Sequence, residues 1–360
     1  MNKIGILTYH RADGYGAVLQ AYALCKFIGH ISNTKPIIID YQCEAIDDVH
    51  KLFQINKNKN IFIEMCKLIP KLSQIPGKRK STKTFTEFRK KYLPISEETY
   101  TKESIRSISD NFDHFIVGSD QTWNFELSGL DKTYFLDFVL DSKKKNSYAA
   151  SFGFEKNFEQ FKDEFLILLS LRETIGAREL QEMGKSFVIS VDPTLLLDSQ
   201  KWRQIAKKPK LKEKFILIYT VLPPKNLFDF ARELAKKTGL KIFYLTASVR
   251  IYNGIKKISG FSPEEFLGLF ANAEYIFTTS FHGTAFSILF HKRFFVELDN
   301  GKRHNDRVDN LLSTLNLHDR NLSGKALADY DHAVDWDSVD AKLEIEKQKS
   351  FKYLKSILSE

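Results

Sequence analysis

The chain has 360 residues, of which 43% are hydrophobic and 28% charged, and this composition excludes a disordered chain or a fibrous repeat. The 54 Lys and Arg residues outnumber the 45 Asp and Glu, and the net charge of +9 favours nucleic acid, phosphorylated metabolites or an acidic membrane face as partners. No apolar run reaches about 18 residues, so no transmembrane helix is expected, and a cytoplasmic location is the default. Three cysteines without metal-type spacing (Cys25, Cys43, Cys66) argue against a disulfide framework or a zinc site.

The first half of the chain alternates apolar strands with helical segments. A strand is predicted over Ile4–Thr8, followed by a glycine turn, a helix from Ala17 to about Phe27 and a strand over Pro36–Asp40. Further strands are predicted over Phe112–Val117, Asn146–Ser151 and Val188–Val191. This β/α alternation predicts a parallel sheet with helices on both faces.

Two segments interrupt the alternation. Residues 44–96 are rich in Lys and Asn and contain Pro70, Pro76 and Gly77, which we expect to interrupt short helices of an insertion. The segment Lys207–Lys214 has no apolar period and is the predicted domain boundary. We therefore expect an N-terminal domain over 1–208, a C-terminal domain over 209–337 and a terminal helix over 338–360.

The alternation resumes after the boundary. Strands are predicted over Phe215–Val221, Lys241–Thr246, Glu274–Thr278 and Arg293–Val296. A capping box, Ser262-Pro263-Glu264-Glu265, opens a helix with an apolar face. At about 150 residues per domain, the expected fold is α/β, with two doubly wound Rossmann-like domains facing a cleft and a C-terminal helix packing back across it. Ligands are then expected beyond the carboxyl ends of the strands.

Gly14-Tyr15-Gly16 follows the first predicted strand and opens a helix. A dinucleotide fingerprint would have a third glycine where this chain has Leu19, which disfavours NAD. Two interpretations remain open. Either the glycines only serve a tight turn, or the backbone approaches another ligand with Asp13, Tyr15 and Gln20 pointing into the cleft.

Gly118–Asn124 directly follows an apolar strand. Its acid, amides and indole suit sugar recognition, because carboxylates and amides bind hydroxyls and an aromatic face covers the ring. The alternative is a local cap with a buried tryptophan, and the spacing does not decide between them. The candidate residues for sugar recognition are Asp120, Gln121, Trp123 and Asn124.

Ser280-Phe281-His282-Gly283-Thr284 follows another strand and opens a helix. His282 thus lies beside a helix N-terminus, which favours an anion, although it could merely cap that helix. Arg178 and the cluster of Arg303, His304, Asn305 and Arg307 are further candidates for a phosphate or carboxylate, with surface ion pairs or an exposed loop as the alternative.

The basic residues concentrate between Lys78 and Lys91. A plain solvated face is the first interpretation of this stretch and a surface for anionic lipid the second. Nucleic acid comes third, because no recognition motif for it is present.

Taken in order, these motifs resemble the polysaccharide pyruvyl transferase family over about residues 4–312. The stretches that carry the resemblance are Gly5-Ile6-Leu7-Thr8, Gly14-Tyr15-Gly16-Ala17-Val18-Leu19-Gln20-Ala21-Tyr22, Val117-Gly118-Ser119-Asp120-Gln121-Thr122-Trp123-Asn124, Ala149-Ala150-Ser151-Phe152-Gly153, Arg178-Glu179, Val191-Asp192-Pro193-Thr194-Leu195-Leu196-Leu197, Pro263-Glu264-Glu265-Phe266 and Ser280-Phe281-His282-Gly283-Thr284. The resemblance implies a two-domain fold like that of GT-B glycosyltransferases. It also implies transfer of the enolpyruvyl group of phosphoenolpyruvate onto a sugar as a cyclic ketal, in capsule or exopolysaccharide assembly, with no metal or other cofactor.

The resemblance also implies roles for particular residues. Family members hold the donor with an Arg and with the His of an Arg-Leu-His-Gly stretch, which Arg178 and His282 match. This chain has Ser280-Phe281 where many members have Arg-Leu, and our hypothesis is that Arg307 or Arg303 supplies the missing guanidinium. His282 is then the expected acid and Asp120 the expected base. The donor clamp would be Arg178, Ser280, Gly283, Thr284 and Arg307, with Arg303 as a further member.

The sequence also offers candidates for acceptor binding and leaves two alternative functions open. The acceptor-binding candidates are Asp13, Tyr15, Gln20, Gln121, Trp123 and Asn124. A lipid-linked oligosaccharide at the inner membrane face would give the basic stretch a role in peripheral contact. The rivals are a GT-B glycosyltransferase that uses a nucleotide sugar and a non-catalytic polysaccharide-binding protein.

Overall fold

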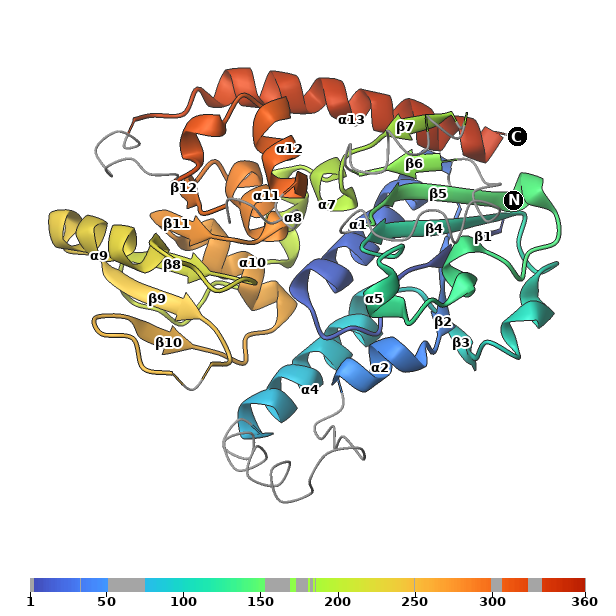
Figure 1. The fold of residues 1–360 in the computed structure, drawn as a ribbon, viewed down its shortest axis with the longest axis horizontal. Helices are drawn as coiled ribbons and strands as arrows, with labels where there is room; N and C mark the ends of the chain where they lie inside the picture. Colours follow the sequence, from blue (N-terminus) through green and yellow to red (C-terminus); the bar gives the residue numbers. More distant parts are fainter. Residues whose placement is uncertain are drawn as a thin grey trace.

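Two parallel β-sheets, one in each half of the chain, form the framework of the molecule (Figure 1). The computed structural model describes residues 3–32, 34–50, 75–152, 169–172, 181, 184, 186–248, 250–298, 306–322 and 332–359. The first sheet holds β1 (Ile4–Leu7), β2 (Ile37–Tyr41), β3 (Ile95–Tyr100), β4 (His114–Asp120), β5 (Lys145–Ala150), β6 (Leu169–Leu171) and β7 (Phe187–Ile189). The second holds β8 (Phe215–Tyr219), β9 (Lys241–Leu245), β10 (Lys256–Ile258), β11 (Tyr275–Thr278) and β12 (Arg293–Val296).

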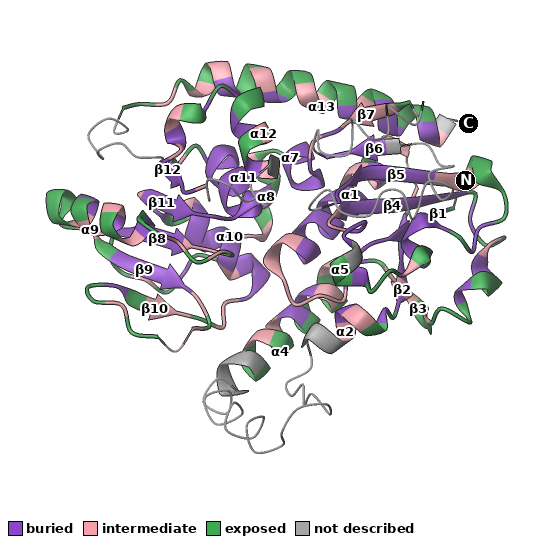
Figure 2. Ribbon diagram, viewed as in Figure 1, coloured by how far each residue is buried: buried purple, intermediate pink, exposed green. Residues whose placement is uncertain are grey.

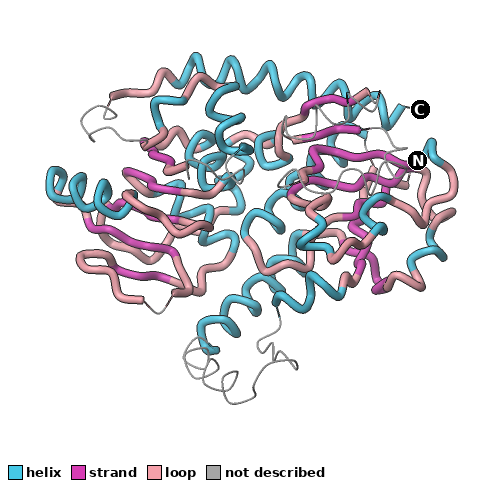
Figure 3. Tube along the Cα trace, viewed as in Figure 1, coloured by secondary structure: helices cyan, strands magenta, loops and turns pink. Residues whose placement is uncertain are grey.

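Helices alternate with these strands and cover the sheets (Figure 3). The α-helices are α1 (Tyr15–Ser32), α2 (Glu44–His50), α4 (Ile75–Tyr92), α5 (Phe125–Ser128), α7 (Pro193–Leu196), α8 (Ser199–Ile205), α9 (Leu227–Thr238), α10 (Pro263–Asn272), α11 (Phe281–Leu289), α12 (Asp306–Thr314) and α13 (Trp336–Ser359). Short 3-10 helices are η1 (Ile105–Ile108), η2 (Lys132–Phe135), η3 (Ser142–Lys144) and η6 (His318–Arg320). None of the described helices is long and apolar enough to cross a membrane.

Both sheets have the same winding. The spatial order is β3-β2-β1-β4-β5-β6-β7 in the first sheet and β10-β9-β8-β11-β12 in the second, and neighbouring strands pair in parallel. The chain therefore moves outward from β1 in one direction and then returns to β4 on its other side. The second sheet repeats this reversal at β8 and β11. Ligands of open parallel sheets bind at such reversals, beyond the carboxyl ends of the strands.

The predicted strands are confirmed with small shifts at their ends, and three strands were missed. The apolar run of β2 fits a strand whose neighbours lie on both sides, and its central residues Ile38 and Ile39 are fully buried. The missed β3 is a polar edge strand, and β10 has the sequence KKI, so neither shows the expected apolar pattern. The missed β6 ends an apolar run, whose period does not distinguish a strand from a buried helix. The predicted α/β class with two doubly wound domains is confirmed.

Of the two segments that interrupt the alternation, residues 44–96 contain α2 and α4, and residues 207–214 form a connection without a helix or strand. Pro76 and Gly77, which we expected to break a helix, lie instead in the first turn of α4, where proline is tolerated because that turn needs no backbone donor. Pro70 lies outside the described residues. The predicted boundary segment connects α8 to β8, and it passes so close to α10 that a Cβ atom on Gly268 would lie 1.8 Å from the carbonyl oxygen of Lys207.

Helices α1, α10 and α13 join the two halves. The ring of Tyr15 on α1 stacks on that of Phe266 on α10 at 4.2 Å between centroids, and its hydroxyl donates to the carbonyl of Phe261. The predicted capping box of α10 is present, with Ser262 and Glu265 exchanging hydrogen bonds. As expected, α13 runs back from the second half over β7 and β6 of the first (Figure 1), where the Tyr353 hydroxyl donates to the carbonyl of Ser147. Figure 2 shows the inner strands of both sheets and the helices between the sheets buried, and the outer side of α13 exposed.

Candidate active site

A cavity of about 530 Å³ lies where the carboxyl ends of the two sheets face each other. Its size is in the usual range for a small-molecule site. Loops after β1 and β4 form one wall and loops after β8 and β11 form the other, so both chain reversals contribute. The lining residues are Tyr9, Ala12, Gly14, Tyr15, Gly16, Ala17, Ile46, Asp120, Gln121, Asn124, Glu126, Leu127, Tyr219, Val221, Leu222, Thr279, Ser280, Phe281, His282, Arg307 and Val308.

The N-termini of α1 and α11 meet at one end of this cavity. Ser280 caps α11 by accepting the backbone N–H of Gly283, and this places His282 in the first turn. The His282 ring lies against α1 at Gly16, where a Cβ atom would be 2.2 Å from Nδ1 and 2.3 Å from Cε1. Only a glycine at position 16 leaves room for this imidazole. The Gly14-Tyr15-Gly16 turn therefore allows a close approach between the two domains as well as a tight bend.

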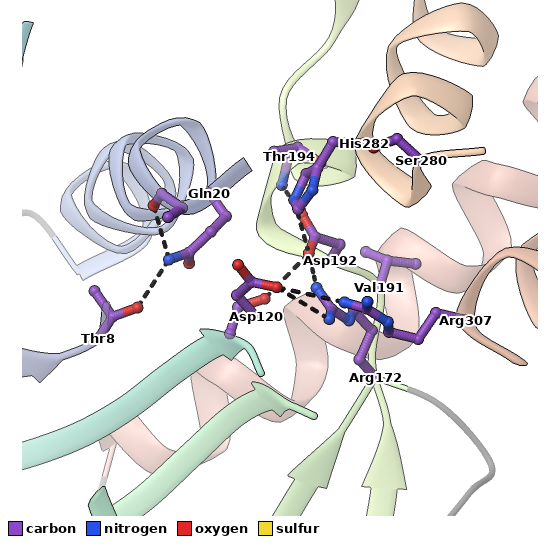
Figure 4. A network of polar contacts seen from close by, with 12 residues as sticks. Thr8, Gln20, Asp120, Arg172, Val191, Asp192, Thr194, Ser280, His282 and Arg307 are labelled. Atoms are coloured by element: carbon purple, nitrogen blue, oxygen red, sulfur yellow. Dashed lines mark hydrogen bonds and ion pairs between the residues drawn. The ribbon is translucent and has the colours of Figure 1, made fainter. Parts of the chain in front are cut away.

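A buried ion network surrounds the other edge of the imidazole (Figure 4). The Arg172 guanidinium at the end of β6 donates from Nη1 to Oδ2 of Asp192 at 2.6 Å. The same carboxylate oxygen lies 3.7 Å from Nε2 of His282. The ring of Phe281 covers the guanidinium at 4.9 Å. Three segments that are distant in sequence thus meet behind the cavity wall.

Asp120 ends β4 with a left-handed backbone, at a φ of 63°. Asp tolerates this conformation better than most residues, and such strain is typical of functional sites. Its Oδ1 lies 3.4 Å from both Arg172 Nη2 and Arg307 Nη1. Burial alone would raise the pKa of Asp120, but Arg172, His282 and Arg307 lower it, so Asp120 is a carboxylate at neutral pH.

The charge of His282 depends on nearby groups that shift its pKa in opposite directions. Burial lowers its pKa below the usual 6.5, the carboxylates of Asp192 and Asp120 act to raise it, and Arg172 and Arg307 lower it further. The imidazole is therefore mostly neutral at pH 7. A bound anion would raise this pKa and favour the protonated ring, because it adds negative charge beside the imidazole.

The structure brings seven of the sequence candidates to the cavity wall. These are Asp120, His282, Ser280 and Arg307 at the charged end, and Tyr15, Gln121 and Asn124 toward the other wall. Arg307, the second residue of α12, reaches the same wall as Ser280. This position is compatible with the hypothesis that Arg307 replaces the arginine that many family members have at the position of Ser280. Arg178 and Arg303 lie outside the described residues.

Other candidates have different surroundings from those expected. Asp13 accepts a hydrogen bond from Arg89 of α4, and Gln20 is fully buried and donates to Thr8. The Trp123 indole is buried, stacks on Phe135 and donates to the carbonyl of Tyr134, which is the alternative that the spacing left open. None of the three side chains lines the cavity, so the predicted sugar contacts find no support in their positions.

The expected amides at Gly283 and Thr284 are also not available to a ligand. The Gly283 N–H donates to the hydroxyl of Ser280, and the Thr284 N–H donates to the carbonyl of Ser280. Both residues are inside α11 and do not line the cavity. The helix cap itself uses these donors, which corrects their predicted place in the clamp.

Arg172 and Asp192 were missed as site residues. Arg172 belongs to an Arg172-Glu173 pair, and the same dipeptide recurs at Arg178-Glu179, so the sequence alone offered two candidates. The useful signal was the position of Arg172 directly after a short apolar run. Asp192 precedes a proline and caps α7. This capping role alone explains an aspartate at that position, so the sequence gives no reason to assign it to a functional site.

Two doubly wound domains with a charged cavity between their facing strand ends define a fold of the GT-B class. The sequence model of the polysaccharide pyruvyl transferase family matches residues 15–297, and the chain belongs to this family of pyruvyl transferase enzymes. The match begins within the glycine turn, at Tyr15, and includes the Asp120 loop and the His282 helix. No curated protein matches the chain at a significant level.

Solved structures agree with this fold. A UDP-N-acetylglucosamine 2-epimerase from Rickettsia bellii is similar with a TM-score of 0.54 and 14% identity, covering 100% of this chain and 96% of the other. A Listeria monocytogenes protein provisionally assigned as a UDP-N-acetylglucosamine 2-epimerase is similar with a TM-score of 0.50 and 11% identity, covering 96% and 90%. At such low identity the likeness shows the two-domain architecture alone.

Proposed function

We propose that the protein transfers the enolpyruvyl group of phosphoenolpyruvate onto two hydroxyls of one sugar, forming a cyclic ketal and releasing phosphate. Family membership supports the reaction class. The observation that carries the proposal is the end of the cavity at which His282 and Arg307 lie, with Arg172 directly behind Asp120. An imidazole with two guanidinium groups nearby suits a small donor with two anionic groups.

The residues account for each step of the proton balance. Protonated His282 gives its proton to the methylene carbon of the donor, and the adjacent carbon becomes an oxocarbenium-like centre. A sugar hydroxyl attacks this centre, phosphate leaves with its bonding electron pair, and a second hydroxyl closes the ketal. One hydroxyl proton restores His282 and the other leaves with phosphate. Asp120 is ionised before the reaction, so it can orient the hydroxyls and accept their protons transiently.

Arg307 is the proposed substitute for the missing donor-binding guanidinium. Arg307→Ala should weaken phosphoenolpyruvate binding by about tenfold or more, because one hydrogen bond to a charged group contributes about 1.5–3 kcal/mol. Isothermal titration calorimetry measures the change. Arg232→Ala on α9 is the matched control, since Arg232 also pairs with an aspartate, Asp229, but does not line the cavity. Unchanged affinity in Arg307→Ala would remove Arg307 from the clamp.

The identity of the donor is tested by competition in the same instrument. We expect phosphoenolpyruvate to bind in the cavity and a nucleoside diphosphate neither to bind nor to displace it. Tight binding of the nucleoside diphosphate would instead favour a glycosyltransferase. Binding of polysaccharide without any release of phosphate from phosphoenolpyruvate, over a panel of acceptors, would favour a non-catalytic protein.

We also propose that the sugar is part of a lipid-linked capsule or exopolysaccharide precursor, and that α4 touches the inner membrane face. Arg79, Lys80, Lys83, Lys90 and Lys91 are exposed on this helix, while Phe85 and Phe88 pack into the core. An exposed basic stripe is attracted to anionic lipid, with about 1 kcal/mol from each Lys near the surface.

Charge reversal tests this contact. The Lys83→Glu/Lys90→Glu variant should bind phosphatidylglycerol vesicles at least about tenfold more weakly than the unchanged protein in a sedimentation assay. Lys236→Glu/Lys237→Glu is the control, because these exposed lysines lie on α9. Equal losses in both variants, or no binding by the unchanged protein, would contradict a specific role for α4.

A further inference from the structure

Asp192 is a fully buried carboxylate that the proposed reaction does not itself use. Its segment is held from two sides by other elements. The hydroxyl of Tyr148 on β5 donates to the carbonyl of Val191, and the Val191 N–H donates to the hydroxyl of Ser350 on α13. The carboxylate is thus fixed relative to both the first sheet and the terminal helix.

The two oxygens of this carboxylate have separate tasks. Oδ1 accepts the backbone N–H and the hydroxyl of Thr194, which is the capping role at the start of α7. Oδ2 points the other way and accepts from Nη1 of Arg172 and from the hydroxyl of Ser119. Oδ2 is also the atom that lies 3.7 Å from Nε2 of His282. The oxygen that faces Arg172 and His282 therefore has no part in the cap.

The two ring nitrogens of His282 also face different surroundings. Nε2 is buried, faces Asp192 and has no hydrogen-bond partner among the described residues. Nδ1 is on the opposite side, at the edge of the ring that lies against Gly16. A proton on Nε2 would point at a carboxylate, whereas a lone pair there would face the same negative charge. The neutral ring therefore favours the tautomer with the proton on Nε2.

We propose that Asp192 is a positioning residue for the proposed reaction, whose Oδ2 both anchors the Arg172 guanidinium and keeps the His282 proton on Nε2. Nδ1 is thereby the atom that exchanges a proton with the substrates. A small approach of the ring turns the 3.7 Å separation into a hydrogen bond when the imidazole is protonated. This proposal rests on the proposed function only for the proton exchange, and the tautomer is open to direct observation.

The test compares Asp192→Asn with the unchanged protein. Asparagine keeps an oxygen for the α7 cap and removes the charge at Oδ2. Asp198→Asn is the matched control, because Asp198 caps α8 in the same way and is half exposed outside the cavity. Nitrogen-15 NMR of the histidine rings, assigned through His282→Gln, reports the tautomer and the pKa of His282 without any substrate.

We expect the unchanged protein and Asp198→Asn to show His282 with its proton on Nε2. In Asp192→Asn the pKa of His282 should fall, because one of two carboxylates that raise it is lost while Asp120, Arg172 and Arg307 remain. The acid-form limb of the pH dependence of kcat/KM should shift to lower pH by the same amount. The kcat should fall by about 10–100-fold, a part of the contribution of a general acid.

Three outcomes separate the possibilities. An unchanged tautomer and titration of His282 in folded Asp192→Asn would overturn the positioning role. A loss of kcat without a shift of the pH limb would assign Asp192 a purely structural role. Altered NMR signals in a protein that never releases phosphate from phosphoenolpyruvate would support the positioning and contradict the proposed function.

Discussion

His282→Ala should abolish turnover and leave the fold intact. The imidazole is the one group at the charged end of the described cavity that can act as a general acid near neutral pH, since Asp120 is ionised and Arg307 keeps its charge. Loss of a general acid lowers the rate by about 10²–10⁴-fold. Phosphate release in the presence of acceptor measures the rate, and circular dichroism on heating measures the fold.

The control for this variant is a second histidine that also faces an aspartate. His291 lies 3.0 Å from Asp340 on the outside of the second half, and His291→Ala should retain normal turnover. Near-normal turnover in His282→Ala would remove His282 from the chemistry. Loss of the thermal transition in His282→Ala would show instead that the ring is needed for packing between α1 and α11.

Gly16→Ala should nearly abolish turnover although no functional group is removed. The new methyl carbon would lie 2.2 Å from Nδ1 of His282, so the ring must rotate away from the cavity and from Asp192. Alanine is a better helix former than glycine by about 1 kcal/mol, so α1 itself is not weakened. The loss of kcat should approach that of His282→Ala, and the same phosphate assay measures it.

A double-mutant cycle on thermal stability shows whether the His282 ring is the cause. In the unchanged background, Gly16→Ala should lower the melting temperature because of the overlap with the ring. In the His282→Ala background the space is vacant, and the same change should raise the melting temperature through helix propensity. An equal shift in both backgrounds would mean that the methyl group meets something other than His282.

The fold could be predicted from the sequence because the buried strands are short apolar runs separated by helical periods. The runs at Ile37–Tyr41 and Phe215–Tyr219 are examples. Strand β3 escaped because its sequence, ISEETY, belongs to a sheet edge where burial does not select apolar residues. Strand β6 escaped because it ends a continuous apolar run, and such a run does not distinguish a strand from a buried helix.

The site was predictable where a polar side chain directly follows a strand. Asp120 is the last residue of β4, and His282 lies in the first turn of the helix after β11; carboxyl ends of parallel strands gather at one edge of a sheet. Gln20 and Trp123 failed because they lie inside a helix or turn, where small rotations decide whether a side chain faces the cavity or the core. Asp192 could not be assigned because its role depends on contacts with Arg172 and His282, which are distant in sequence.

Mass spectrometry of lipid-linked sugar acceptors incubated with the protein and phosphoenolpyruvate tests the proposed reaction most directly. A parallel series contains nucleotide sugars. We expect one acceptor to gain a single pyruvyl ketal, with one phosphate released for each ketal and no product in His282→Ala. An acceptor that gains a sugar unit from a nucleotide sugar, while no acceptor gains a pyruvyl group, would contradict the assignment of this cavity to phosphoenolpyruvate.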